Sequence, residues 1–163
     1  MNDDFKDLLG LFNEYQVEYL VIGGYAVVEY TEPRFTKDLD IWVKASEENA
    51  QRVYEALSRF GAPVRQLTAT DFSREGYFFQ MGREPQRIDV LMSMPGVPFD
   101  QAWTNQHEVQ IDGQTVRFIG LQDLITAKEA SGRPQDLLDA ARLHEALERL
   151  QMAEKDHSEG RKV

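Results

Sequence analysis

The stretch VIGGYAVVEYTEPRFTKDLDIWV, residues 21–43, decides the interpretation of the whole chain. Gly23 and Gly24 end an apolar run, and Asp38 and Asp40 fall where the pattern otherwise predicts a buried strand. Because side chains on a strand alternate between faces, both carboxylates point to one face, with Cα atoms about 7 Å apart. Charge in a buried strand is costly unless something compensates for it.

A third carboxylate stands in a similar position. Asp89 lies in RIDVLM, residues 87–92, where the alternate apolar side chains form the opposite face of a second strand. Three carboxylates on neighbouring strands repel each other unless a cation lies among them. Mg²⁺ suits such a site, because it takes oxygen ligands from few carboxylates and from substrate phosphates. Two ions about 4 Å apart would hold the attacking and leaving oxygens of a phosphoryl transfer. The alternative is that Asp38 and Asp40 form salt bridges with Arg34, Lys37 or Arg87.

The glycine pair has two interpretations. Lacking Cβ atoms, Gly23 and Gly24 let the backbone approach a triphosphate, and the helix that follows offers free N–H groups to it. The pair could instead be a simple turn between a strand and a helix.

The rest of the pattern alternates helices and strands. Apolar spacing predicts a helix over residues 3–15, Ser46 and Gly61 mark the ends of another, and Asp112-Gly113 predicts a hairpin. The other expected helices are residues 25–30, 121–131 and 134 to about 152, and the strands are residues 17–22, 37–44, 76–81, 87–92, 107–111 and 115–119. This order predicts an α/β or α+β fold with helices packed on a sheet. We expect a catalytic core in residues 1–120, a C-terminal helical hairpin in 121–152 that completes the site, and a frayed polar tail in 153–163.

Composition excludes several classes of protein. The net charge of −10 disfavours a chain that wraps a nucleic-acid backbone, so we expect no extended DNA binding. No window approaches the roughly 20 apolar residues of a membrane span, and the acidic start is unlike a signal peptide. The absence of cysteine excludes disulfides and thiolate metal sites and is compatible with the cytoplasm, where we expect the protein to be.

Spaced motifs resemble a known group of enzymes. Hydrophobic-Gly-Gly-x-Ala at residues 22–26, Arg-x-Thr-x-Asp-Leu-Asp at 34–40 and Ile-Asp-Val at 88–90 are similar to the minimal nucleotidyltransferases of the polymerase-β-like superfamily. Within it, the chain is most similar to the AbiE-type (AbiEii) toxin group, whose helical segment carries a Lys followed by Arg-x-x-Asp-x-x-Asp. Here Lys128 precedes that pattern at residues 133–139. The resemblance covers roughly residues 17–147 as motifs, not as continuous identity.

The resemblance implies a mixed sheet with packed helices and the transfer of a nucleoside monophosphate from an NTP, with Mg²⁺ and release of pyrophosphate. By position, Gly23 and Gly24 would hold the triphosphate. Asp38 and Asp40 would ligate both ions. Asp89 would complete one metal site and deprotonate or orient the acceptor hydroxyl.

Further roles follow from the same resemblance. Lys128 is the candidate cation for the β- or γ-phosphate, and Arg34 and Thr36 would order their loop or contact the nucleotide. Arg133, Asp136 and Asp139 are expected to support the site, with one aspartate aiming Lys128 or Arg133. The alternatives are a solvated Lys128 and two surface acids on the helix.

Other residues receive structural interpretations. Phe78, Phe79 and Trp42 are expected in the core, whereas Trp103 fits either the core or an acceptor cleft. The three histidines are not at metal-ligand spacing and are expected to be structural or on the surface.

Three functions remain open. The first is transfer to a macromolecule, either RNA such as a tRNA end or a partner protein, as in toxin–antitoxin pairs with a cognate antitoxin. The second is the same chemistry on a small hydroxylated antibiotic. The third is a nucleotide-binding module without catalysis, against which the three carboxylates argue. Only about 40 residues follow the last expected strand and the chain is acidic, which favours a small acceptor or one docked on a second subunit.

Overall fold

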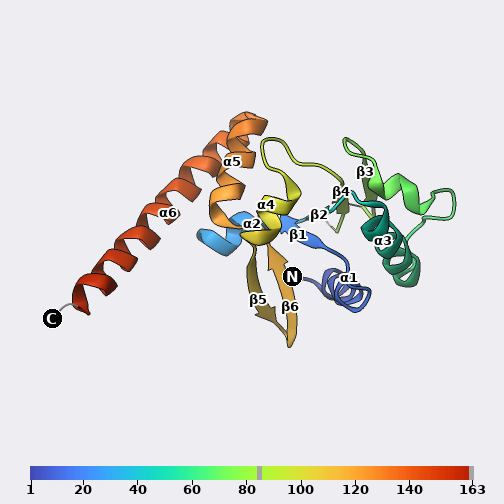
Figure 1. Ribbon diagram of the computed structural model, residues 1–163, viewed down its shortest axis with the longest axis horizontal. Helices are drawn as coiled ribbons and strands as arrows, with labels where there is room; N and C mark the ends of the chain where they lie inside the picture. The colour runs from blue at the N-terminus through green and yellow to red at the C-terminus, as the bar shows by residue number, and fades with distance from the viewer. Residues whose placement is uncertain (84–85, 162–163) are drawn as a thin grey trace.

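A mixed β-sheet organises the chain. The computed structural model describes residues 1–83 and 86–161, and in these ranges it contains a six-stranded sheet of order β3-β4-β2-β1-β6-β5 (Figure 1). The strands are β1 (Tyr19–Ile22), β2 (Leu39–Val43), β3 (Phe78–Met81), β4 (Ile88–Leu91), β5 (His107–Ile111) and β6 (Gln114–Phe118). β1 runs parallel to β6 and β2 runs parallel to β4, whereas the other neighbours are antiparallel. Both edges are therefore antiparallel hairpin strands around a mixed centre.

The central strands fix the register of the site. All four residues of β1 are buried, and in β2 only Asp40 departs from full burial. Ile22 pairs with Asp40 across β1 and β2, and Asp40 pairs with Asp89 across β2 and β4. The end of β1, where Gly23 follows, thus lies beside the two aspartates.

Helices form two groups around the sheet. α1 (Asp3–Glu14) packs against α3 (Glu47–Phe60), and α2 (Gly23–Tyr30) contacts α5 (Leu121–Ser131) and α6 (Pro134–Gly160). The Ser46 side chain accepts a hydrogen bond from the Asn49 backbone at the start of α3, and Gly61 ends that helix in the left-handed conformation. Both ends agree with the prediction from sequence. Asp112 and Gly113 both have positive φ angles in the β5–β6 turn, as that hairpin prediction requires.

Two short elements were not predicted from the sequence. They are the 3₁₀ helix η1 (Ala69–Ser73) and helix α4 (Phe99–Thr104). Neither is long enough to show a helical period in its apolar residues, which explains why the pattern did not reveal them. α2 also begins at Gly23, two residues before the predicted start.

The C-terminal helix is longer than expected. α6 continues to Gly160 instead of ending near Met152, so the expected frayed tail is helical as far as that residue, and residues 162–163 lie outside the described ranges. No glycine or proline interrupts the segment before Gly160, so nothing in it breaks the helix. The last turns are exposed and run away from the sheet (Figure 1). In residues 1–83 and 86–161, no helix combines the length and apolar character needed to cross a membrane.

Candidate active site

Two aspartates stand side by side at the centre of the sheet. Asp40 on β2 faces Asp89 on β4 in the parallel register, as the sequence predicted for strands that could be neighbours. Burial, the charge of Asp89 and a hydrogen bond with it raise the pKa of Asp40 to about 7; Asp38 adds to this effect and Arg87 opposes it. Near neutral pH the pair therefore carries negative charge that its surroundings compensate only in part.

Arg87 is the cation among these carboxylates. Its Nη2 lies 3.3 Å from Asp38 Oδ2 and its Nε lies 3.2 Å from Asp89 Oδ1. The Arg87 backbone N–H also donates to Asp38 Oδ1 at 3.3 Å, and Gln80 Nε2 donates to Asp89 Oδ1 at 3.0 Å. The sequence offered Arg87 as a partner of Asp38 and Asp40 but did not point to Gln80. Its position opposite Asp89 depends on the β3–β4 register, which the sequence did not supply.

The first glycine is required by the aspartate beside it. Gly23 has φ +67°, and a Cβ atom there would lie 2.1 Å from Asp40 Oδ2. A Cβ atom on Gly24 would lie 2.8 Å from the Thr36 methyl group. Hence these glycines are needed for packing whether or not a ligand binds. No side chain caps the N-terminus of α2, so its backbone N–H groups remain available to an anion.

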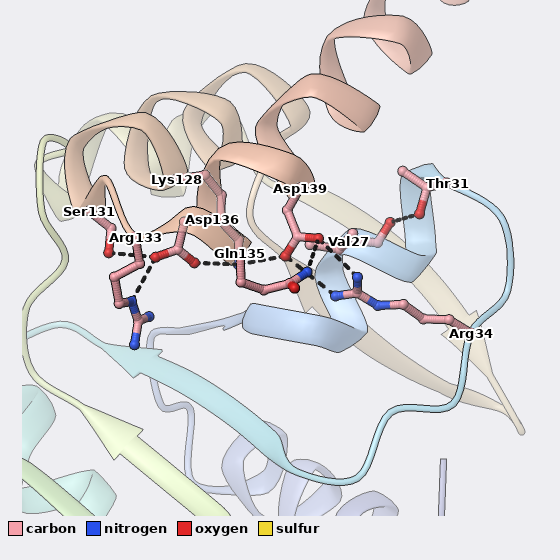
Figure 2. A network of polar contacts seen from close by, with 9 residues as sticks. All are labelled: Val27, Thr31, Arg34, Lys128, Ser131, Arg133, Gln135, Asp136 and Asp139. Atoms are coloured by element: carbon pink, nitrogen blue, oxygen red, sulfur yellow. Dashed lines mark hydrogen bonds and ion pairs between the residues drawn. The ribbon is translucent and has the colours of Figure 1, made fainter.

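Asp139 is the hub of a network between the helices and the loop before β2 (Figure 2). It accepts two hydrogen bonds from Arg34, at 2.9 and 3.4 Å, and one from Lys128 Nζ at 3.2 Å. Gln135 Nε2 donates to the same carboxylate at 3.2 Å. The Asp139 side chain is only 2% exposed, so the interpretation of this residue as a surface acid is wrong.

Asp136 makes a second set of contacts, one helical turn earlier. It accepts hydrogen bonds from Arg133 Nε at 2.7 Å, Ser131 Oγ at 2.8 Å and Lys128 Nζ at 3.3 Å. Burial alone would raise the pKa of Asp136, but these partners outweigh it and lower the pKa. Burial alone would likewise raise the pKa of Asp139, but its contacts with Arg34 and Lys128 outweigh burial and lower this pKa. Lys128 is 15% exposed and bound to both aspartates, so it is not a solvated surface lysine.

A cleft joins the strand and helix groups. It has a volume of about 480 Å³ and lies between the sheet and the start of α6. Of the residues predicted for the site, it is lined by Gly23, Asp40, Asp89, Lys128, Arg133 and Asp136. The other predicted residues, Gly24, Arg34, Thr36, Asp38 and Asp139, are not part of its lining.

The carboxylates fit a cation that shares its ligands with a substrate. Across the described part of the chain, no group of three or more acidic or histidine side chains has the arrangement of a complete metal site. Asp40 and Asp89 nevertheless face the cleft with negative charge that Arg87 compensates only in part, and Mg²⁺ is commonly held by one or two carboxylates together with substrate phosphates.

The aromatic residues divide differently from the prediction. Phe78 is 64% exposed and lines the cleft, so the expectation that it lies in the core is wrong. Phe79 packs against Phe72, with ring centroids 5.7 Å apart, and Trp42 is buried, as expected. Trp103 stacks on Phe99 and does not line this cleft.

Solved structures with a similar fold are nucleotidyltransferases. The antibiotic-resistance factor ANT(2″)-Ia superposes with a TM-score of 0.54 at 17% identity, over 98% of this chain and 93% of its own. The lincosamide antibiotic adenylyltransferase LnuA gives 0.52 at 16% identity, over 88% and 96%. A candidate nucleotidyltransferase from Thermotoga maritima gives 0.52 at 13% identity, over 98% and 91%. At such identities the similarity shows the fold alone, and it confirms the predicted nucleotidyltransferase fold.

Sequence comparison places the chain in one family. No curated protein matches it in sequence. The model of a family described as nucleotidyl transferase of unknown function (DUF2204) matches residues 1–158, nearly the whole length of the chain. The chain therefore belongs to this nucleotidyl transferase family.

Proposed function

We propose that this protein transfers a nucleoside monophosphate from an NTP to a hydroxyl acceptor, in the presence of Mg²⁺, and releases pyrophosphate. The observation that carries the proposal is the pairing of Asp40 with Asp89 on one wall of a cleft whose other wall presents Lys128. A cation held by the aspartates would neutralise the charge that builds up on the transferred phosphate. We expect two such ions, which Asp38, Asp40 and Asp89 would hold.

The residues of the chain divide the remaining work. The α2 N-terminus at Gly23 and the Lys128 ammonium group bind the triphosphate from two sides of the cleft. Asp89 accepts the hydrogen bond, and then the proton, of the attacking hydroxyl. The oxygen forms a bond to the α-phosphorus while the bond to the β-phosphate oxygen breaks, and pyrophosphate leaves. Arg34, Thr36 and Asp139 hold the loop and the helices in place around this site.

The acceptor that we favour is a macromolecule, an RNA such as a tRNA end or a protein, in a cytoplasmic toxin–antitoxin pair of the AbiE type. Support comes from the predicted motif of Lys128, Arg133, Asp136 and Asp139, which forms one connected network in the fold. The partner of such a toxin would be a cognate antitoxin.

A second candidate is transfer to a small antibiotic. Two structures of similar length and fold are antibiotic-modifying proteins, one solved with bound lincomycin and the other with adenylyl-2″-tobramycin. These superpositions include 88 to 94% of this chain, which supports a cleft of comparable size.

Labelled transfer tests both candidates together. The protein is incubated with each α-³²P-labelled NTP, Mg²⁺ and total RNA, protein or small-molecule extract, beside Asp89→Asn and the exposed control Asp156→Asn. We expect label in one fraction with the wild type and Asp156→Asn, and none with Asp89→Asn. Equal labelling by Asp89→Asn, or no stabilisation of the wild type by millimolar Mg²⁺-NTP, would contradict the proposed function.

A further inference from the structure

An exposed aromatic ring stands on the sheet next to the paired aspartates. Phe78 on the edge strand β3 pairs with Leu91 of β4, and two residues along the same face Gln80 pairs with Asp89. Gln80 Nε2 donates to Asp89 at 3.0 Å, which ties this part of β3 to the carboxylate. Phe78 and Leu91 both line the cleft, so an apolar shelf borders Asp89 about two residues, or roughly 7 Å, away.

Phe78 leaves an apolar ring exposed at the cleft, which indicates that a ligand covers it. Its side chain is 64% exposed, whereas Phe79 on the other face is packed against Phe72. Tyr77, the residue before Phe78, is also exposed, but the Arg74 guanidinium lies over its ring, 5.8 Å from the centroid. Of these two exposed aromatic residues, Phe78 is the one that lines the cleft.

The strand order indicates the side of the site from which the acceptor approaches. From β1 to β3 the sheet presents Gly23, then Asp40, then Asp89, and finally Phe78. In phosphoryl transfer, the attacking and leaving oxygens lie roughly in line on opposite sides of the phosphorus. In the proposed function, pyrophosphate would leave on the side of Gly23, because α2 contacts α5, the helix that carries Lys128. The acceptor therefore approaches from the side of β3.

We infer that Phe78, supported by Leu91, is the platform on which the terminal base of a single-stranded RNA acceptor stacks, which brings the ribose hydroxyl to Asp89. This inference rests on the proposed function and selects RNA over protein among its acceptors. Proteins that hold single-stranded RNA combine aromatic platforms for the bases with cations for the backbone. Arg133, 78% exposed, lines the cleft, and Arg74 and Arg83 are exposed in the segments that precede and follow β3.

A pair of oligonucleotides tests the stacking directly. The probes are a 5′-fluorescein RNA hexamer with a 3′-terminal adenosine and the same hexamer with an abasic 3′-terminal ribose. Their binding is measured by anisotropy, with and without Mg²⁺ and α,β-methylene-ATP, which cannot transfer its nucleotide. Wild-type protein should bind the adenosine end roughly 5- to 100-fold more tightly, the range that base stacking on an aromatic side chain supplies.

Matched variants separate stacking from other effects. Phe78→Ala should bind both hexamers equally, Phe78→Trp should keep the preference, and Tyr77→Ala should resemble the wild type. Equal binding of both hexamers by the wild type, a preference that survives in Phe78→Ala, or no binding of either hexamer would overturn the inference.

The nucleotide site is checked in the same samples. The melting temperature should rise with Mg²⁺ and α,β-methylene-ATP by the same amount in wild type and Phe78→Ala, because Phe78 lies on the acceptor side. If this stabilisation is absent in the wild type, the proposed function fails. If it is present while the hexamers are bound without preference, only the inference about Phe78 fails.

Discussion

Two clusters of aspartates face each other across the cleft, and their charges are balanced in opposite ways. Of the strand carboxylates, Asp38, Asp40 and Asp89, the first and the last form ion pairs with the Arg87 guanidinium, and Asp40 lies beside Asp89. The helix carboxylates, Asp136 and Asp139, are contacted by three cations: Lys128, Arg34 and Arg133. Accordingly, the pKa of Asp40 is raised to about 7, whereas the pKa values of Asp136 and Asp139 are lowered.

In the proposed function, the strand carboxylates bind the cation, whereas the helix carboxylates position the elements around it. The helix carboxylates already contact cationic partners, and these contacts fix the positions of α5, α6 and the loop that carries Arg34. Carboxylates that repel each other around a cleft favour the binding of a cation, and in the proposed function they form the reacting centre. Similar residue types thus serve different purposes, and the balance of partners distinguishes them.

The largest expected effect is at the strand carboxylates. Asp40→Asn should reduce nucleotidyl transfer by about 1000-fold or more, because it removes negative charge at the centre of the reaction. The same variant should be more stable than the ligand-free wild type. Transfer by Asp40→Asn at the wild-type rate would contradict the catalytic role proposed for the strand carboxylates.

The stabilisation by Asp40→Asn should depend on pH. Because the folded-state pKa of Asp40 is raised from 3.8 to about 7, the wild type loses stability as pH rises through this interval. The gain in the variant should therefore grow between pH 4 and 7 and level off above it, with a ceiling of about 4 kcal/mol. Urea unfolding at pH 5 and pH 8 measures it, and a gain that is larger at pH 5 would contradict this sign.

The helix carboxylates should respond in the opposite direction. Asp139→Asn leaves Arg34 without its buried counter-ion and Lys128 with Asp136 alone, and should cost about 3 kcal/mol of unfolding free energy at pH 7. Because the pKa of Asp139 is lowered, its stabilisation should be present above pH 4 and disappear as pH falls below that value. Urea unfolding checks this cost, with the exposed Asp156→Asn as control; equal stability of the two variants would contradict it.

A pair of glycine variants sharpens the comparison at the strand side. Gly23→Ala adds a methyl group 2.1 Å from Asp40 Oδ2 at a positive φ, whereas Gly61→Ala, also at positive φ, meets nothing within 4 Å. We expect about 1 kcal/mol of destabilisation at Gly61 from backbone strain and about 2 to 3 kcal/mol at Gly23. The difference, measured by thermal unfolding, reports the contact with Asp40, and equal costs would show that Asp40 moves aside freely.

The smallest effect is expected at Arg87. Arg87→Gln should destabilise the ligand-free protein by about 1 kcal/mol, since its ion pairs are partly exposed. It should also increase the rise in melting temperature that Mg²⁺ alone produces, because the ion then meets less competition for Asp38 and Asp89. Arg74→Gln, which pairs with Asp71 instead, is the control. A smaller Mg²⁺ response in Arg87→Gln than in the control would contradict the competition.

The sequence predicted the elements whose signals are local. Ser46, Gly61 and the Asp112-Gly113 turn specify their structures through hydrogen bonds and φ angles of neighbouring residues. The alternating Asp38 and Asp40 and the single Asp89 pointed to a shared face, and the structure brings Asp40 and Asp89 together.

Other features depend on register and on long-range pairing. Whether Phe78 or Phe79 faced the core could not be decided from two adjacent aromatic residues, because one residue of register reverses the faces of a strand. The Arg34–Asp139 contact joins residues 105 positions apart, and no local pattern encodes it. The assignment of metal and nucleotide roles to individual residues therefore stays a prediction.

The parallel pairing of β1 with β6 has a consequence for the order in which the molecule is completed. Val21 and Phe118 are partners in that pairing, and Lys128 and Asp139 follow β6 in the chain. During synthesis, the aspartates of β2 and β4 emerge well before their cationic counterpart on the helices. The cleft, which Asp136 of α6 also lines, therefore exists only after α6 has begun to form.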